Sequence, residues 1–190
     1  MRQQAASQIV NIIIPAAGEG SRFRKQGWHR AKPFIDINGK PMIQHVTENI
    51  KSTSSRTTII IREKDILPNK SIIDFLKAND IQIQSLPSIT EGTACTVLSC
   101  HSLINTEQPL LIANSDQLID LDINIFINDA QTRLLDGSIL VFKDPIKNPK
   151  WSFAKVDAST GFVTEVAEKK SHIRVSYCRN LLLCQRQGFC

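Results

Sequence analysis

A loop with little side-chain bulk lies near the start of the chain, directly after a short apolar run. Its glycines, Gly18 and Gly20, follow two alanines, so main-chain N–H groups can approach an anion closely here. Arg22 adds a permanent cation whose planar head binds phosphate through two parallel hydrogen bonds. These features favour phosphate binding, and the alternative is a tight strand-to-helix turn with a surface arginine. The candidate phosphate-binding residues are Ala16, Ala17, Gly18, Gly20 and Arg22.

A second cation, Lys32, lies ten residues beyond Arg22 in a segment with little fold signal of its own. Pro33 biases the backbone of Lys32 toward an extended conformation. The alternative for Lys32 is a solvated surface lysine. Its closeness to the loop favours a place in the same site.

A carboxylate, Asp116, follows a short apolar run at residues 110–113. Mg²⁺ is usually held by one or two carboxylates together with substrate phosphates, so a phosphate loop and Asp116 would supply both halves of such a site. The alternative is an aspartate that caps a helix or forms a turn. The functional interpretation of Asp116 is a Mg²⁺ ligand.

Apolar runs and helical periodicities alternate along the chain, which predicts an α/β fold with a mostly parallel sheet flanked by helices. In such sheets ligands bind at the carboxyl ends of the strands, so the glycine loop and Asp116 are expected to face one site. The predicted strands are 9–14, 34–37, 57–61, 81–85, 110–113 and 137–142, followed by a hairpin of 153–157 and 162–166. The predicted helices are 41–50, 71–78, 93–103, capped by Thr93, and 123–135, capped by Asp122.

Composition limits the class of protein. The 190 residues suit one soluble domain, and the formal charge of +5 comes partly from three arginines near the end, with no basic stripe elsewhere. We therefore expect no nucleic-acid partner. No run is long enough to cross a bilayer, and residues 9–17 are too short and broken for a secretory signal, so we expect a cytoplasmic protein without membrane contact. The five cysteines have no close Cys-x-x-Cys pair and are expected to be reduced.

Six motifs in fixed order resemble the sugar-1-phosphate nucleotidyltransferases, or nucleoside-diphosphate-sugar pyrophosphorylases. The resemblance covers residues 9–172 and implies a single domain with a Rossmann-like mixed sheet. It also implies a reaction in which a sugar 1-phosphate attacks the α-phosphate of an NTP and releases pyrophosphate. The motifs are Ala-Ala-Gly-Glu-Gly-Ser-Arg at 16–22, Lys32-Pro33, Gly-Lys-Pro-Met-Ile at 39–43, Glu91-Gly92-Thr93-Ala94, Asn114-Ser115-Asp116 and Glu168-Lys169.

The resemblance also implies a role for each matching residue. Arg22 would hold the departing pyrophosphate, and Lys32 would neutralise charge around the α-phosphate. Asp116 would bind Mg²⁺, while Glu168 and Lys169 would hold the sugar phosphate. The implied nucleotide-binding residues are Ala16, Ala17, Gly18, Gly20, Ser21, Gly92 and Thr93.

Two positions depart from the family pattern. In this family a glutamine often stands shortly before the base-binding glycine. In this chain Leu86 and Pro87 stand near that position instead. A second metal-binding aspartate normally follows the Glu-Lys motif, but the last aspartate of this chain is Asp157. Base choice and the complete metal site are therefore left open by the sequence.

The last residues, 173–190, differ from the body by an excess of Cys and Arg. Suitable codons for residues 176–184, read one base later, give an apolar run of the kind that this family places there. We therefore hypothesise an out-of-frame tail on a C-terminally truncated enzyme. The alternative is a divergent carboxyl terminus that packs back as a strand.

Three functions follow from these patterns. The first is an Mg²⁺-dependent enzyme that acts on an NTP and a sugar 1-phosphate, serving surface polysaccharide synthesis. The second is an inactive, truncated nucleotide-binding remnant, and the third uses a non-sugar acceptor such as phosphocholine. A dinucleotide-binding oxidoreductase is disfavoured because Phe23 stands where the third glycine of Gly-x-Gly-x-x-Gly would be.

Overall fold

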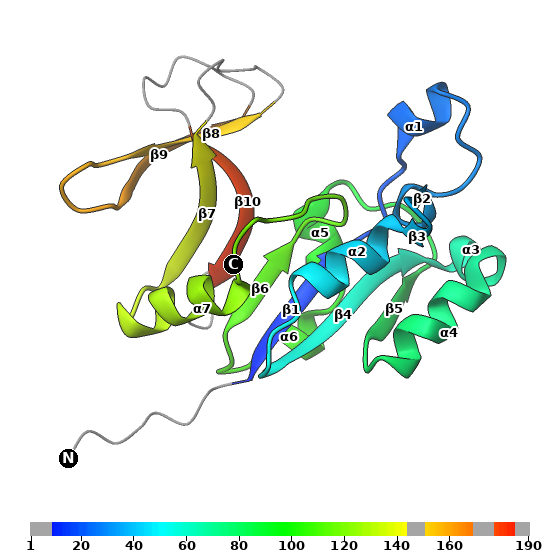
Figure 1. Cartoon of the computed structure of the whole chain (residues 1–190), viewed down its shortest axis with the longest axis horizontal. Helices are drawn as coiled ribbons and strands as arrows, with labels where there is room; N and C mark the ends of the chain where they lie inside the picture. The colour runs from blue at the N-terminus through cyan, green and yellow to red at the C-terminus, as the bar shows by residue number, and fades with distance from the viewer. Residues whose placement is uncertain (1–8, 144–150, 169–176, 185–190) are drawn as a thin grey trace.

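The computed structural model describes residues 9–143, 151–168 and 177–184, with the backbone alone for 168 and 177–184. One large mixed sheet organises the molecule (Figure 1). Its four central strands are parallel, in the order β5 (Gln82–Leu86), β4 (Ser55–Arg62), β1 (Val10–Pro15) and β6 (Leu110–Ala113).

An antiparallel half continues the sheet beyond β6. Its central strand, β10, pairs with β6, β7 and β8. The strand β9 pairs with β8 alone. A separate two-stranded hairpin stands on the other side of the molecule, near α1 and α2 (Figure 1). The antiparallel strands are β10 (Tyr177–Cys184), β7 (Gly137–Lys143), β8 (Ser152–Val156) and β9 (Val163–Glu168), and the hairpin is β2 (Asp36–Ile37) with β3 (Lys40–Pro41).

Helices connect the parallel strands and flank the sheet, as the alternating sequence pattern predicts. None of them, within the described ranges, has the length and apolar character to cross a membrane. The helical elements are α1 (Ser21–Lys25), η1 (Lys32–Phe34), α2 (Met42–Asn49), α3 (Glu63–Ile66), η2 (Leu67–Asn69), α4 (Lys70–Ala78), α5 (Thr93–Leu98), α6 (His101–Ile104) and α7 (Ile123–Thr132).

Two cores lie on opposite faces of the parallel strands, because successive residues of a strand point to opposite faces. Ile12 and Ile14 of β1 join the larger core, which also takes the apolar sides of α2, α4 and α7. Ile13 joins the smaller core with Val97 and Cys100. Burial on both faces explains why the central strands read as continuous apolar runs.

Four local predictions were wrong. The helix expected over 93–103 is broken into α5 and α6, and Gly92, not Thr93, precedes its first residue. At the break, the Ser99 hydroxyl donates to the Thr96 carbonyl at 2.6 Å, and the Cys100 N–H bonds to the Val97 carbonyl at 3.0 Å instead of to Thr96. Such a hydroxyl bond competes with the regular helix ladder.

The other three errors concern residues 32–41. Lys32 begins the 3₁₀ turn η1, and the extended residue is Ala31 before it. The strand expected over 34–37 is only β2, because Phe34 is buried and its N–H bonds to the Ala31 carbonyl at 2.9 Å. Pro41 ends β3 with extended angles and does not begin the helix.

The last described segment forms a strand inside the sheet. The backbone of β10 lies between β6 and β7, with a bulge between Arg179 and Leu181. This course agrees with the alternative of a carboxyl terminus that packs back as a strand. The out-of-frame origin of residues 173–190 and the domain boundary at 172 stay predictions.

Candidate active site

A cleft of about 680 Å³ opens where β1 and β6 end. This is the carboxyl edge of the parallel strands, where α/β sheets bind their ligands. The glycine loop, Lys32 and Asp116 line this cleft together, so the structure brings these three predicted parts to one place. The lining residues are Pro15, Ala16, Gly18, Gly20, Ser21, Arg22, Phe23, Lys32, Pro33, Thr93, Asn114, Ser115, Asp116 and Trp151.

The strand β1 delivers the loop to the cleft. The Ala16 N–H donates to the Ile60 carbonyl at 2.8 Å, which extends the pairing of β1 with β4 by one residue. Ala17 then turns into the smaller core, where its methyl group is 2% exposed and away from the cleft lining. Gly18 is exposed beyond it and has open space where a Cβ would stand.

Gly20 is required by its conformation and by a neighbour. Its φ of 63° lies in the left-handed region that disfavours other residues. A Cβ built on Gly20 would stand 3.3 Å from Lys32 Cβ, which is closer than ordinary van der Waals contact. The absence of a side chain at Gly20 therefore lets the stem of Lys32 pass close to the loop.

Lys32 lies between a carboxylate and an aromatic ring. Its Nζ forms an ion pair with Asp116 Oδ2, and the two side chains are 24% and 38% exposed. The same Nζ stands 5.6 Å from the centroid of the Phe23 ring, within range of a cation–π contact. The charges of Lys32 and Asp116 thus neutralise each other.

The first residue of α5 reaches the cleft, and the loop before it does not. Thr93 lines the cleft, whereas Gly92 has extended backbone and room for a Cβ. The Thr90 hydroxyl donates to the Gly92 carbonyl at 3.1 Å and lies 2.6 Å from the Thr96 hydroxyl. These bonds fix the loop on which the predicted base-binding residues lie.

The predicted sugar-phosphate residues fall at the limit of what the structure describes. Glu168 is the last residue of β9, with only its backbone described, and Lys169 lies outside the described residues. Their roles stay predictions.

Two aromatic side chains of the cleft were missed from the sequence. Phe23 directly follows Arg22, and its apolar character gave no signal of a contact with Lys32. Trp151 comes from the antiparallel half, where its ring meets Phe142 edge to face at 5.6 Å and 89°. A lone tryptophan ahead of a predicted strand was the only available signal, and it did not indicate the cleft. Asn114 and Ser115 were recognised only as part of a motif.

The charge pattern fits a Mg²⁺ ion that arrives with phosphate. Among the described residues, Asp116 supplies the only carboxylate in the cleft lining, and no group of three or more possible ligands exists there. A metal held by protein alone does not fit this arrangement. A Mg²⁺ ion held by one carboxylate and by substrate phosphates does.

Comparison with known proteins identifies the class. A family model described as nucleotidyl transferase matches residues 11–180, and this chain belongs to that family. The bifunctional protein GlmU of Methanocaldococcus jannaschii is 29% identical over 123 residues, which cover 62% of this chain and 28% of that protein. The chain thus spans little more than a quarter of this curated relative's length.

Solved structures show the same fold. A nucleoside-diphosphate-sugar pyrophosphorylase from Vibrio cholerae RC9 superposes with a TM-score of 0.66 at 25% identity, covering 92% of this chain and 73% of that one. A UDP-glucose pyrophosphorylase in complex with UDP-glucose gives a TM-score of 0.73 at 16% identity, with coverages of 93% and 76%. The α/β fold predicted from the sequence is thereby confirmed.

Proposed function

We propose that this chain carries the site of an Mg²⁺-dependent sugar-1-phosphate nucleotidyltransferase. The reaction joins the nucleotidyl group of an NTP to a sugar 1-phosphate and releases pyrophosphate. One observation carries the proposal: Arg22, Lys32 and Asp116 line a single cleft with the glycines of the loop. The names of the relatives, a bifunctional GlmU and a nucleoside-diphosphate-sugar pyrophosphorylase, support the same class of chemistry.

The chemistry asks for placement and charge more than for covalent help. A phosphate oxygen of the acceptor attacks the α-phosphorus, and the bond to the bridging oxygen breaks as pyrophosphate leaves with its electron pair. Such a transfer is accelerated mainly by alignment of the reacting groups and by fixed positive charge. The cleft offers Arg22 and Lys32 for that charge.

The roles follow from this chemistry. Main-chain N–H groups around Gly18 and Gly20 approach the triphosphate, and Arg22 holds the leaving pyrophosphate through paired hydrogen bonds. Lys32 balances the charge that develops on the α-phosphate. Asp116 would hold Mg²⁺, which when bound screens the phosphate oxygens and draws them into line.

Because Lys32 and Asp116 form an ion pair, phosphate binding to Lys32 and Mg²⁺ binding to Asp116 should depend on each other. A phosphate that recruits Lys32 leaves Asp116 without its cation, and a metal ion that recruits Asp116 leaves Lys32 without its anion. Each change alone costs free energy, because a half-buried charge loses its partner. Phosphate and Mg²⁺ together satisfy both side chains, so the two ligands should bind with positive coupling.

Glu168 and Lys169, together with Trp151 of the cleft lining, are the residues we assign to the acceptor side. We further propose that the product is an activated sugar for surface polysaccharide. The alternative of phosphocholine as acceptor is an outcome of the test below and not a separate proposal.

The test is release of pyrophosphate from each of the four NTPs with a panel of sugar 1-phosphates and with phosphocholine. A thermal-shift screen with Mg²⁺ first selects the NTP, because a bound nucleotide raises the unfolding temperature. Release with one sugar 1-phosphate, lost in Arg22→Ala, supports the proposal. Nucleotide binding without turnover on any acceptor would instead identify a nucleotide-binding remnant.

A further inference from the structure

The β2–β3 hairpin has little packing of its own to hold it in place. Each strand has two residues, and Asp36, Ile37 and Lys40 are all exposed. Ile37, the apolar side chain of β2, is 40% exposed. An isolated two-stranded hairpin is at best marginally stable in water. The hairpin is therefore held by its buried neighbours in the chain, Ile35 and Ile43, and by polar connections to the rest of the molecule.

The hairpin is also the direct continuation of the turn that carries Lys32. Lys32 opens η1, and its carbonyl accepts from the Ile35 N–H at 3.2 Å. The Ile35 carbonyl in turn accepts from the Met42 N–H at 2.9 Å, where α2 begins. Three buried residues, Pro33, Phe34 and Ile35, separate Lys32 from β2, so the turn of Lys32 and the hairpin are joined by one packed segment of main chain.

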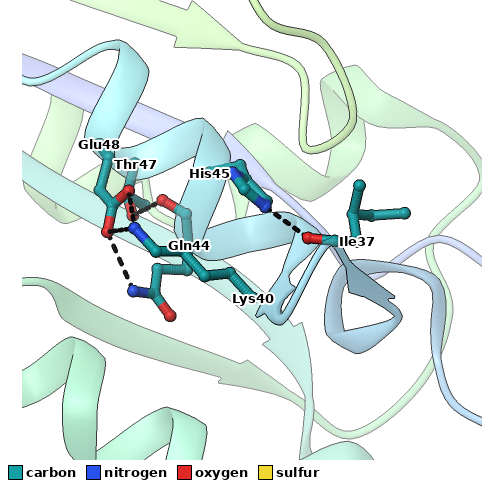
Figure 2. Close-up of polar contacts among 6 residues, drawn as sticks. All are labelled: Ile37, Lys40, Gln44, His45, Thr47 and Glu48. Atoms are coloured by element: carbon teal, nitrogen blue, oxygen red, sulfur yellow. Dashed lines mark hydrogen bonds and ion pairs between the residues drawn. The ribbon is translucent and has the colours of Figure 1, made fainter.

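Two side-chain connections join the hairpin to α2 (Figure 2). His45 Nε2 lies 2.7 Å from the carbonyl oxygen of Ile37, and because a carbonyl can only accept, Nε2 carries the proton. On the other strand Lys40 Nζ donates to both oxygens of Glu48 at 2.9 and 3.1 Å. Figure 2 shows both connections reaching down from one helix to the two strands.

The two connections differ in strength. The side chains of Lys40 and Glu48 are 47% and 48% exposed, and an ion pair so exposed to solvent contributes little to stability. The hydrogen bond from Lys40, followed by one from Gln44, lowers the pKa of Glu48, so the pair stays charged at neutral pH. His45 is partly buried, and its partner is the main-chain carbonyl of Ile37. The Lys40–Glu48 pair, by contrast, joins two side chains.

We propose that His45 is a positioning residue for Lys32, acting through its hydrogen bond to the Ile37 carbonyl. This inference rests on the proposed function for its kinetic consequence, although its structural consequence can be measured separately. His45 fixes β2 against α2, and β2 fixes the turn from which Lys32 enters the cleft. The Lys40–Glu48 pair on the same helix is a secondary connection.

The first experiment compares variants of α2 in the nucleotidyl transfer assay. His45→Ala should lower kcat about tenfold or more with little change in the KM for NTP, since Lys32 acts on the transition state. His45→Gln places an amide N–H near the position of Nε2 and should restore kcat, whereas His45→Asn is too short. Glu48→Gln is the matched control, with kcat close to that of the wild type.

A double-variant cycle separates positioning from general damage. If His45 acts through Lys32, then His45→Ala should lower kcat no further in a Lys32→Met background. Equal losses in both backgrounds would overturn the proposal, as would full activity of His45→Ala. Thermal unfolding of each variant shows that it is folded at the assay temperature.

The second experiment needs no turnover. Lys32 is held by Asp116 and Phe23, so its amine should react slowly with an acylating reagent. In His45→Ala the acylation rate of Lys32, read by peptide mass spectrometry, should rise about twofold to fivefold, while the exposed Lys70 reacts unchanged. His45→Gln should react as the wild type does. An unchanged Lys32 rate in His45→Ala overturns the positioning role.

These two readouts distinguish the failures. A raised Lys32 rate in a protein that transfers no nucleotidyl group keeps the positioning role and rejects the proposed function. If the protein transfers nucleotidyl groups, but His45→Ala changes neither kcat nor the acylation rate of Lys32, only the positioning role is rejected.

Discussion

At the scale of single residues, two glycines of the same loop are expected to serve different purposes. Gly20 has a left-handed backbone and faces Lys32 Cβ, so it is a requirement of the folded chain. Gly18 has open space at its Cβ position, so nothing within the protein requires a glycine there. A purpose for Gly18 must then come from a ligand that approaches the main chain.

Substitution by alanine separates the two. Gly20→Ala should lower the free energy of unfolding by about 1–2 kcal/mol, the cost of a left-handed residue, measured by urea denaturation. Gly18→Ala should change the free energy of unfolding by less than about 0.5 kcal/mol and weaken NTP binding. Normal NTP affinity in a stable Gly18→Ala protein would contradict close approach of phosphate to this loop.

The residues of the site could be predicted only in part. Asp116 is recognisable because a charged side chain at a strand end stands out against an apolar run, and Arg22 and Lys32 because they lie in and close to the glycine loop. Phe23 and Trp151 look like ordinary apolar residues, and their places follow from contacts between segments far apart in the chain. Such contacts leave no local pattern in the sequence.

At the scale of elements, apolar periodicity was a reliable guide wherever one core decides the structure. Ile43, Val46 and Ile50 recur at helical spacing. All three are buried in the larger core, on the side of α2 that faces the sheet. The break between α5 and α6 was not predictable from spacing, because it depends on which carbonyl the Ser99 hydroxyl reaches. The pairing of β10 with β6 and β7 is likewise long-range.

The hairpin of β8 and β9 is expected to respond to acid through one side chain. Asp157 accepts hydrogen bonds from the N–H and hydroxyl of both Ser159 and Thr160, at 2.6–3.0 Å. These bonds, the Ser159 hydroxyl first, lower the pKa of Asp157 from 3.8 to about 2. The carboxylate therefore stabilises the turn only while it is ionised.

The sign of the pH effect follows from this lowered pKa. Between pH 3.8 and about 2 the unfolded chain binds the proton more readily than the folded one, so stability falls as the pH falls. The wild type should unfold at a higher temperature than Asp157→Ala at neutral pH, and the difference should shrink as the pH falls through this range. A difference independent of pH would contradict the role of the ionised carboxylate.

At the scale of the whole molecule, the sheet is buried on both faces in its parallel half, and a buried thiol reports on that burial. Cys100 is 2% exposed in the smaller core, and desolvation raises its pKa, whereas Cys95 is exposed. Only the thiolate reacts with alkylating reagents. Cys100 should therefore react only when the helices open away from the sheet.

Peptide mapping after iodoacetamide treatment measures this opening. Cys95 should be modified rapidly in native buffer, and Cys100 should become reactive only in parallel with urea unfolding. The Mg²⁺-bound nucleotide should slow Cys100 modification further, because a ligand of the folded state lowers the population of open forms. Rapid native modification of Cys100 would show that the smaller core is not closed.

The convergence of Arg22, Lys32 and Asp116 on one triphosphate is tested most directly by calorimetric titration with NTP, with and without Mg²⁺. In the wild type Mg²⁺ should tighten NTP binding, because phosphate and metal together replace the Lys32–Asp116 ion pair. In Asp116→Asn, metal-free NTP should bind more tightly than it does to the metal-free wild type, since Lys32 is released, and Mg²⁺ should add nothing. Equal tightening by Mg²⁺ in both proteins, or unchanged binding in Lys32→Met, would contradict a shared site.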